Sequence, residues 1–425
     1  DRSSIAERAL QAALKQKPAP LYLRAFAGHI ETGNFTDHMA RISECDWIIE
    51  VVVERLDVKR DLFARVDEHR KAGSIITTNT SGIPIHLIAD GRSEDFRSHF
   101  LGTHFFNPPR YLKLLEVIPT QDTLPRVISQ ITHFCETYLG KEVVRCKDTP
   151  GFIANRVGVY AMALVFNVTA ELGLSVTEVD KLTGPAIGRP KTGTFRLGDL
   201  VGLDVAHHVI TGLQENCPDD SQVQQLQMPV FFQHLIQSGS FGTKSGKGFY
   251  QKSDEKDDKG RSIIFGLNLG TLTYERPAKS SLPSLQLVRQ IEDLTKRIQA
   301  LFAAEDAGGQ LLRKTFAGLF AYVSKRIPEI ADSIAAIDDA LRAGFGWEMG
   351  PFEYWDALGI QSGIDAAREH GFEVADWVQA MVDNGHPVFY RTQQGQRMCF
   401  DPASSAYVEI AGSDRFVQLG TLRTR

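Results

Sequence analysis

The sequence predicts an α/β protein in which a parallel, doubly wound sheet comes first and helical domains follow. Two observations lead to this fold class. Apolar, β-branched runs alternate with helical stretches as far as residue 148, and long helical patterns dominate from residue 149 onwards. With 425 residues, the chain has room for roughly three domains.

The predicted sheet consists of short apolar runs separated by helical patterns. Ile48 to Val53 is mostly apolar and β-branched, as expected of a strand buried on both faces. Further strands are expected at residues 74–78, 100–106, 114–118 and 142–144, and helices at residues 4–16, 58–70, 85–89 and 124–139. Because strands and helices alternate, the strands should be parallel.

The chain beyond residue 149 is predicted to be mainly helical. A long apolar helix is expected at residues 152–172, and further helices continue to about residue 238. Lys252 to Arg261 is rich in Lys and Asp and predicts an exposed turn. Ser280 to Ser284 predicts a linker, after which helices resume at about residues 285–383.

The helical part contains an internal repeat. Five residues recur in the same order and with nearly the same spacing: Asp180, Gly188, Phe195, Asp199 and Gly202 correspond to Asp338, Gly346, Phe352, Asp356 and Gly359. Each copy then reaches a Phe-Tyr pair, at Phe249-Tyr250 and Phe389-Tyr390, and a polar turn and an apolar run that suggest a hairpin. Two similar modules in tandem explain this better than chance similarity does.

The charge and cysteine content argue against several classes of protein. The 47 Lys and Arg against 52 Asp and Glu give a net charge of -5, so no basic excess points to a nucleic-acid partner. The five cysteines lie far apart without a C-x-x-C pair, which predicts reduced thiols in a cytoplasmic protein. No apolar run reaches the roughly 18 residues of a membrane span, so none is expected.

Polar residues follow the predicted strands at their carboxyl ends, where ligands bind in open α/β sheets. Glu54 follows the first strand, Asn79 and Ser81 follow the second, and His104 and Asn107 lie at the end of the third. These residues are therefore expected to share one edge of the sheet.

Glu116 lies inside the fourth apolar run, where a carboxylate is costly unless it is paired. His104 on a neighbouring strand is a natural partner, and such a pair can act as a general base with its orienting carboxylate. Simpler readings stay open on spacing alone: His104 as a structural residue, Glu116 as a helix cap, Asn79 and Ser81 as turn formers, and Glu54 as an exposed acid.

Several longer motifs resemble the 3-hydroxyacyl-CoA dehydrogenase family and occur in that family's order. They are residues 54–59 (ERLDVK), 79–82 (NTSG), 104–108 (HFFNP), 115–118 (LEVI), 148–156 (DTPGFIANR), 188–190 (GRP), 199–204 (DLVGLD) and 244–250 (KSGKGFY). The resemblance is strong over about residues 45–250 and looser over the second helical copy. The duplicated helical region looks like that of multifunctional fatty-acid oxidation proteins, which often carry a hydratase domain as well.

The resemblance implies a Rossmann-like sheet and two tandem all-α modules like the C-terminal part of 6-phosphogluconate dehydrogenase. The implied domains are residues 1–148, a partial NAD-binding domain, residues 149–279, and residues 280–425, a non-catalytic repeat. The last assignment follows from Arg313, which occupies the position corresponding to Asn155.

The resemblance also implies the NAD-dependent oxidation of (S)-3-hydroxyacyl-CoA to 3-oxoacyl-CoA in fatty-acid β-oxidation. His104 would take the proton of the 3-hydroxyl, and Glu116 would hold the imidazole and stabilise its charge. Ser81 and Asn155 would hydrogen-bond the substrate oxygen and the surroundings of His104. The positions that match NAD contacts are Glu54, Lys59, Asn107 and Lys244. No metal is expected.

The implied partners are the acyl-CoA substrate and either a second copy of the chain or a β-oxidation complex. Lys15 and Lys17 lie near the region where the family contacts CoA, and they equally suit the solvated end of an exposed helix.

One departure from the family concerns the cofactor site. The family begins with a strand and a G-x-G-x-x-G turn that holds the NAD pyrophosphate, and this chain has no such motif. The nearest glycine cluster, Gly344-Phe345-Gly346, lies in the second helical copy. We expect the first βαβ unit to be missing from this chain. The alternative is a non-catalytic acyl-CoA-binding or scaffolding module.

Overall fold

The computed structural model describes residues 2–278, 280, 282–410 and 412. By its internal contacts the chain divides into two compact units. The first unit comprises residues 1–102 and 119–130, and the second comprises residues 103–118 and 131–425. The three domains predicted from the sequence remain a prediction, and the last of them extends over residues 411 and 413–425, which lie outside the described residues.

One sheet has the order β1-β2-β3-β4-β5. Its strands are β1 Trp47–Glu50, β2 Ile75–Thr78, β3 Phe100–Phe105, β4 Leu114–Pro119 and β5 Glu142–Arg145. The pairs β1–β2, β2–β3 and β4–β5 are parallel. The predicted Rossmann-like parallel sheet is thereby confirmed. Strands β3 and β4 are buried at nearly every position, as expected of parallel strands with both faces covered.

The helices of the first unit are α1 Ser4–Ala13, α2 Leu56–His69, α3 Ile85–Ala89 and α4 Glu94–Ser98, with short 3-10 helices η1 Arg24–His29 and η2 Met39–Glu44. Phe63 of α2, Phe96 of α4 and Phe100 of β3 form an aromatic cluster with ring centroids 5.2–5.5 Å apart. The predicted N-terminal helix is present, but it buries no residue, and Ile5 stays 75% exposed.

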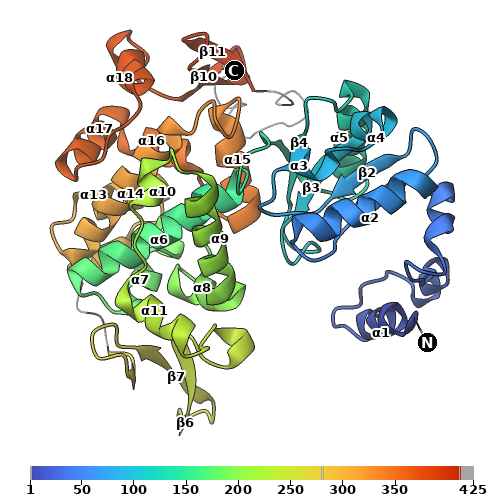
Figure 1. Ribbon diagram of the computed structural model, residues 1–425. Coiled ribbons are helices and arrows are strands. Elements are labelled where there is room, and N and C mark those ends of the chain that lie inside the picture. The colour runs from blue at the N-terminus through green and yellow to red at the C-terminus, as the bar shows by residue number, and fades with distance from the viewer. Residues whose placement is uncertain (1, 279, 281, 411, 413–425) are drawn as a thin grey trace. The chain divides into compact units, whose positions relative to one another are not determined.

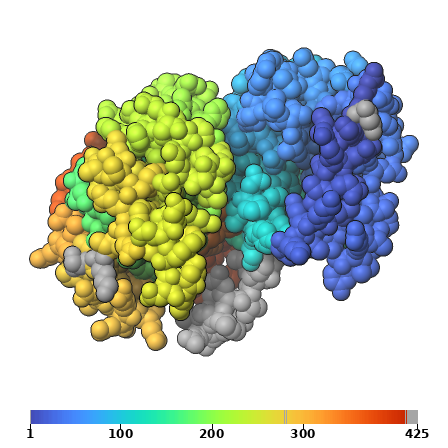
Figure 2. Space-filling model, turned by 90° about the horizontal axis from the view of Figure 1, so that it is seen from below, coloured from blue at the N-terminus to red at the C-terminus, as the bar shows by residue number. Residues whose placement is uncertain are grey.

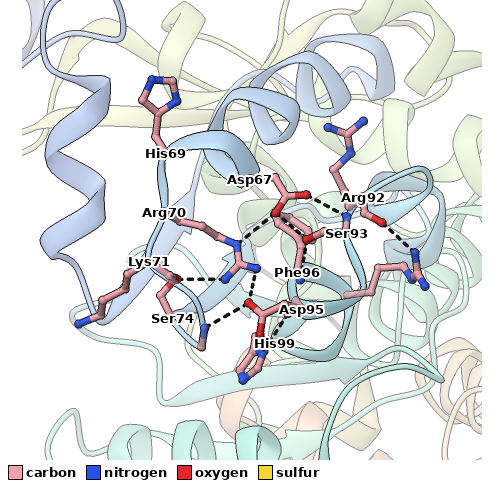
Figure 3. A network of polar contacts seen from close by, with 12 residues as sticks. Asp67, His69, Arg70, Lys71, Ser74, Arg92, Ser93, Asp95, Phe96 and His99 are labelled. Atoms are coloured by element: carbon pink, nitrogen blue, oxygen red, sulfur yellow. Dashed lines mark hydrogen bonds and ion pairs between the residues drawn. The ribbon is translucent and has the colours of Figure 1, made fainter.

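A polar network ties the end of α2 to the start of α4 (Figure 3). Arg70, whose side chain is only 3% exposed, places Nη2 2.5 Å from Oδ2 of Asp95 and Nε 3.4 Å from Oδ1 of Asp67. Asp67 in turn accepts hydrogen bonds from the amide and hydroxyl of Ser93, both at 2.8 Å. These contacts fix the connections that lead into β2 and β3.

The second unit contains α5 Pro125–Thr137 in part and two helical segments (Figure 1). The first helical segment (residues 151–278) has α6 Ala154–Leu172, α7 Val176–Leu182, η3 Pro185–Ile187, α8 Phe195–Val201, α9 Leu203–Asn216, α10 Ser221–Gln224, α11 Val230–Gln237 and η4 Thr243–Ser245. The second helical segment (residues 282–410) has α12 Pro283–Leu287, η5 Val288–Gln290, α13 Leu294–Ala303, α14 Ala307–Lys325, α15 Ile334–Phe345, α16 Pro351–Leu358, α17 Ile360–Glu369 and α18 Asp376–Asp383.

Each helical segment ends in a three-stranded antiparallel sheet, so the prediction of all-α modules is corrected. The strands are β6 Tyr250–Lys256, β7 Ser262–Leu267 and β8 Tyr274–Glu275 in the first, and β9 Tyr390–Gln393, β10 Gln396–Asp401 and β11 Ala406–Glu409 in the second. Figure 2 shows the yellow-green to yellow part of the chain, with α11 and the β6–β7 hairpin, at the surface of the second unit.

The two hairpins suggested by the Phe-Tyr pairs are confirmed. The exposed turn expected at Lys252 to Arg261 is shorter than predicted. Lys252 to Lys256 belong to β6, and only residues 257–261 connect β6 to β7. This part of β6 is largely exposed on both faces, so it lacks the alternation of apolar and polar residues that identifies a strand.

Two buried aspartates organise the first helical segment. Asp180 accepts hydrogen bonds from two successive backbone amides, beginning with Phe195 at 2.6 Å, and from the hydroxyl of Tyr250 at 2.6 Å. Asp199 accepts from the amides of Phe249 and Tyr250 at 2.8 and 2.9 Å. The aspartates thus fasten α8 and the start of β6 to α7.

The same hydrogen bonds occur in the second helical segment. Asp338 accepts from two successive amides, beginning with Phe352 at 2.9 Å, and from the hydroxyl of Tyr390 at 2.8 Å. Asp356 accepts from the amides of Phe389 and Tyr390 at 2.7 and 2.9 Å. Five residues of the sequence repeat therefore have equivalent hydrogen-bonding roles in both segments.

Helices α6 and α14 pack side by side at the centre of the helical segments (Figure 1). The rings of Tyr160 and Tyr322 stack between them with centroids 3.8 Å apart and planes inclined by 9°. Within the part of the chain that the structure describes, no helix is both long and apolar enough to cross a membrane.

Candidate active site

The sequence-predicted pair of His104 and Glu116 is formed. Nδ1 of His104, near the end of β3, lies 2.7 Å from Oε2 of Glu116 in the middle of β4. The side chain of His104 is 8% exposed and that of Glu116 is 0% exposed. The carboxylate inside the apolar strand therefore has the partner that its burial requires.

The other oxygen of Glu116 faces the N-terminus of α6. Oε1 accepts hydrogen bonds from the backbone amides of Ile153 and Ala154 at 3.0 and 2.8 Å. The Sγ atom of Cys146 lies 3.5 Å from the same oxygen. Backbone amides at a helix N-terminus are good donors to a carboxylate, so the start of α6 holds Glu116 in place.

This arrangement fixes the tautomer of His104. An ionised carboxylate can only accept, so Nδ1 of the imidazole carries the hydrogen that points to Glu116. Nε2 then holds a lone pair. The imidazole is thus arranged to accept one proton at Nε2.

Two aromatic rings hold the imidazole in place. The ring centroids of Phe106 and Phe152 lie 4.9 and 5.7 Å from that of His104. Phe152 has a φ of 49°, a left-handed conformation that is uncommon for a residue with a side chain, and it follows Gly151 with a φ of 73°. This turn places the Phe152 ring against His104 and presents the next two amides to Glu116.

Sequence reasoning missed Cys146 and the two amides that bind Glu116. Cys146 directly follows β5, so its position at the same sheet edge as His104 was a usable signal. Burial, and after it the negative charge of Glu116, raises the pKa of the Cys146 thiol well above its ordinary value. The thiol is therefore a neutral neighbour of the carboxylate and a poor nucleophile.

Glu54 and Ser81 come together in the first unit. Oε1 of Glu54 accepts from the amides of Ser81 and Gly82 at 3.0 and 3.1 Å and from the hydroxyl of Thr80. Burial favours the neutral carboxyl, but Thr80, Lys59 and these amides hold the pKa of Glu54 below its ordinary value. Glu54 is thus an anion that shapes the turn after β2.

Lys59 is also bound to carboxylates. Its side chain is 1% exposed, with Nζ 2.9 Å from Oε1 of Glu50 and 3.4 Å from Oε2 of Glu54. Sequence reasoning missed Glu50, which also accepts from the hydroxyl of Thr78 at 2.5 Å. The signal was present, because Glu50 interrupts an apolar run just as Glu116 does.

The remaining predicted residues lie in the second unit. Asn107 is exposed after β3 and precedes a cis peptide bond to Pro108. Lys244 is half exposed and pairs with Asp204 at 2.5 Å. Asn155 is partly buried and directly follows Ala154, whose amide binds Glu116. Ser81 belongs to the other unit, so its contact with the reacting oxygen stays a prediction, as does that of Asn155.

Comparisons with protein families cover most of the chain. The model of the 3-hydroxyacyl-CoA dehydrogenase NAD-binding domain matches residues 3–149. The model of the C-terminal domain of the same enzymes matches residues 151–252 and again residues 314–393. The chain belongs to the 3-hydroxyacyl-CoA dehydrogenase family.

Curated relatives of this family extend over most of the chain. A probable 3-hydroxyacyl-CoA dehydrogenase of Bacillus subtilis is 43% identical over 400 residues, which is 94% of this chain and 50% of that protein. One of Deinococcus radiodurans is 45% identical over 261 residues, 61% of this chain and 74% of that protein. A putative fatty acid oxidation complex trifunctional enzyme of Rickettsia felis is 32% identical over 355 residues, 83% of this chain and 47% of that protein. The chain spans about half the length of the Bacillus and Rickettsia relatives.

A solved structure supports the family's fold. The 3-hydroxybutyryl-CoA dehydrogenase of Escherichia coli K12 matches with a TM-score of 0.64 over 90% of this chain and 92% of that chain. At 23% identity this match shows the shared fold alone. The family match over residues 3–149 also identifies NAD as the cofactor of this 3-hydroxyacyl-CoA dehydrogenase family member. Among the described residues, no group of three His, Cys, Asp or Glu side chains could hold a metal ion.

Proposed function

We propose that the full-length protein oxidises (S)-3-hydroxyacyl-CoA to 3-oxoacyl-CoA with NAD and that His104 is the general base. The observation that carries this proposal is the buried hydrogen bond of 2.7 Å between His104 Nδ1 and Glu116 Oε2, which leaves Nε2 as the proton acceptor. The family membership supplies the reaction class.

In the proposed reaction, the chain's residues accept one proton from the substrate and stabilise the charge that this creates. Nε2 of His104 accepts the proton of the substrate 3-hydroxyl while the C3–H bond breaks, and NAD, when bound, supplies the acceptor for that hydride. Glu116 stabilises the imidazolium that forms. Ser81 and Asn155 are assigned to hydrogen-bond the substrate oxygen, so that the hydroxyl points towards Nε2.

Several residues of the first unit, around Glu54, have the chemistry needed to bind part of NAD. Shortly before Glu54 in the chain, Val51 and Val53 leave 69% and 61% of their surface exposed, and exposed apolar side chains suit contact with an aromatic ring. We assign Glu54 and Lys59 here, and Asn107 and Lys244 in the second unit, to holding the cofactor. Because its ammonium is enclosed by Glu50 and Glu54, Lys59 acts by keeping Glu54 charged and in place.

The second helical segment is proposed to be a duplicate of the first that has no catalytic role of its own. The repeated hydrogen bonds of Asp338 and Asp356 support the duplication. Arg313, at the position of Asn155, donates to the carbonyls of Phe302 and Ala304, so it caps the end of α13 instead of reaching a substrate.

The assembly of the full-length protein is inferred from its relatives. Two Rickettsia relatives are named fatty acid oxidation complex trifunctional enzymes, which favours a role in β-oxidation for this chain. A homodimer remains a prediction, which light scattering on the full-length protein would test.

The proposed function is tested by steady-state NADH formation in the full-length protein with His104→Gln. Turnover should fall by a factor of about 100 or more, because general-base catalysis contributes about that much. His99→Gln is the matched control: His99 is also buried and near a carboxylate, Asp95, but it precedes β3 at the opposite end from His104. It should keep turnover. Near-normal turnover in His104→Gln would reject the assignment, and failure of the wild type to form NADH would favour a non-catalytic acyl-CoA-binding module.

A further inference from the structure

We propose that Arg156 is a positioning residue through which the second helical segment holds α6, and with it Glu116, in place for catalysis. This inference rests on the proposed function of the His104–Glu116 pair. It gives a role in the reaction to the helical segment that contributes no catalytic side chain.

Glu116 depends on the position of α6 for two of its hydrogen bonds. The amides of Ile153 and Ala154, at the start of this helix, bind Oε1 of Glu116. A shift of the helix start would therefore move the carboxylate or leave one of its oxygens without donors. Arg156 lies in the same first turn and donates from Nη1 to the carbonyl of Pro150 at 3.3 Å, so it also holds the preceding loop.

The Arg156 side chain is 0% exposed and lies among polar and charged groups. Its Nε donates to the hydroxyl of Tyr322 at 2.8 Å, and its Nη2 donates to Glu329 at 2.7 Å and Asp220 at 2.8 Å. Arg326 adds a second cation, 2.9 Å from Asp220 and 2.6 Å from Glu329. The cluster thus contains two arginines and two acids, and removal of one partner leaves a buried charge unpaired.

Most members of this cluster come from one segment of the chain. Tyr322, Arg326 and Glu329 all belong to the second helical segment, in or just after α14. A fully buried arginine in the first turn of α6 is therefore fastened to the other segment by two of its four hydrogen-bond partners, Tyr322 and Glu329.

A separate set of contacts from the second helical segment supports His104. The ring of Phe345 in α15 occupies the space beside Gly158 of α6, where a Cβ atom would lie 2.2 Å from the ring. Phe345 also packs against Phe106 with centroids 6.1 Å apart, and Phe106 packs against His104. The second helical segment thus supports both members of the pair, Glu116 through Arg156 and His104 through Phe106.

A purely stabilising ion cluster would have the same burial, so the test must separate position from stability. Tyr322→Phe removes the hydroxyl that accepts from Arg156 and donates to Asp220, and it keeps the ring that stacks on Tyr160. Tyr354→Phe is the matched control. Tyr354 is equally buried in the same segment, but its hydroxyl donates to the carbonyl of Ile187, outside α6.

The experiment uses the full-length protein and three readouts: urea unfolding, steady-state kinetics, and the downfield proton resonance of the hydrogen shared by His104 and Glu116. Tyr322→Phe should lose more stability than Tyr354→Phe, because its hydroxyl bonds both Arg156 and Asp220, and the urea curves check that both variants are folded under the conditions of the kinetics. Only Tyr322→Phe should lower kcat, by about tenfold with KM for the acyl-CoA nearly unchanged, because loss of alignment acts on the transition state. Only Tyr322→Phe should shift or broaden the shared-proton resonance. Glu329→Gln keeps the size of a half-exposed side chain and removes its charge. It should also lower kcat and shift or broaden the shared-proton resonance.

Equal kcat and an equal resonance in Tyr322→Phe and Tyr354→Phe would overturn the positioning role and leave the proposed function intact. Failure of the proposed function would instead be recognised by an active His104→Gln variant. Because the resonance reports the hydrogen bond without turnover, the positioning role would still be decided in that case.

Discussion

Glu116 holds His104 with one oxygen and the start of α6 with the other. The 2.7 Å hydrogen bond to the imidazole and the 2.8 and 3.0 Å hydrogen bonds from the helix amides meet on one carboxylate that is 0% exposed. A carboxylate with such partners is fixed in orientation, and a fixed carboxylate beside the imidazole would stabilise an imidazolium when one forms.

Cysteine reactivity should follow burial. Cys146 is 3% exposed and the pKa of its thiol is raised by burial and by Glu116, so alkylation at neutral pH should be slow. Cys45 is exposed and should react first. Mass spectrometry after brief treatment of the native protein with iodoacetamide measures both. Rapid labelling of Cys146 would show that the site around Glu116 is open to solvent.

The free energy of unfolding should fall as pH rises towards the pKa of two buried aspartates, Asp180 and Asp356. Burial raises the pKa of both Asp180 and Asp356 to about 7. In the unfolded chain the pKa of an aspartate is about 3.9, so these groups bind their protons more tightly when folded. Their contribution to stability is complete below about pH 4 and is lost as pH rises through about 7.

Asp180→Asn isolates this effect, because the amide does not titrate. The free energy of unfolding of the wild type, measured in urea relative to the variant, should fall between about pH 4 and pH 7. A difference that stays constant or rises over this range would mean that Asp180 is ionised throughout.

The repeated aspartate–tyrosine hydrogen bonds should have similar strength. Tyr250→Phe and Tyr390→Phe each remove a hydroxyl that donates to a buried aspartate oxygen, and each should cost about 1–3 kcal/mol of stability because that oxygen loses a partner. The two losses should add in the double variant if the sites are independent. Tyr274→Phe, whose hydroxyl donates to a neutral carbonyl, is the control and should cost about 1 kcal/mol. A much smaller loss at Tyr390 than at Tyr250 would argue against equivalent roles.

The Arg70 network should contribute more to stability than an exposed ion pair does. Arg70→Met leaves Asp67 and Asp95 without their shared partner and should lower the free energy of unfolding by about 1–3 kcal/mol. Arg97→Met is the control in the same unit, because Arg97 and Asp122 are 37% and 56% exposed and their pair is worth less than about 1 kcal/mol. Equal losses would mean that the network in Figure 3 is no stronger than a surface pair.

The sequence predicts the sheet well because its signals are local. Every strand predicted up to residue 148 is present, and its ends differ from the predicted ends by a few residues at most. Each strand is a short continuous apolar run, which is typical of a buried strand and too short for an ordinary helix. The short helix α4 was not predicted, because it is held by Phe96 in the aromatic cluster and by Ser93 at its N-cap, and neither gives a periodic pattern over five residues. The end of β6 was missed for the same kind of reason, because its side chains are mostly exposed.

The candidate site was only partly predictable. His104 and Glu116 could be paired because a carboxylate inside an apolar strand demands a partner. The amides of Ile153 and Ala154 carry no sequence signal, since any residue has an amide and only the turn at Gly151 and Phe152 aims them at Glu116. The cluster around Arg156 joins residues more than 160 positions apart, which only the packing of α6 on α14 brings together.

The pairing of His104 with Glu116 is tested most directly by the rate of hydride transfer in a single turnover. Full-length wild type and Glu116→Gln would be mixed with NAD and a 3-hydroxyacyl-CoA, and the appearance of NADH would be followed in stopped flow. The amide keeps the shape of the side chain and removes the charge that stabilises the imidazolium, so the rate should fall by a factor of about 100 or more while cofactor binding is kept. A rate within a few-fold of the wild type would contradict the account, because Glu116 would then not support the base.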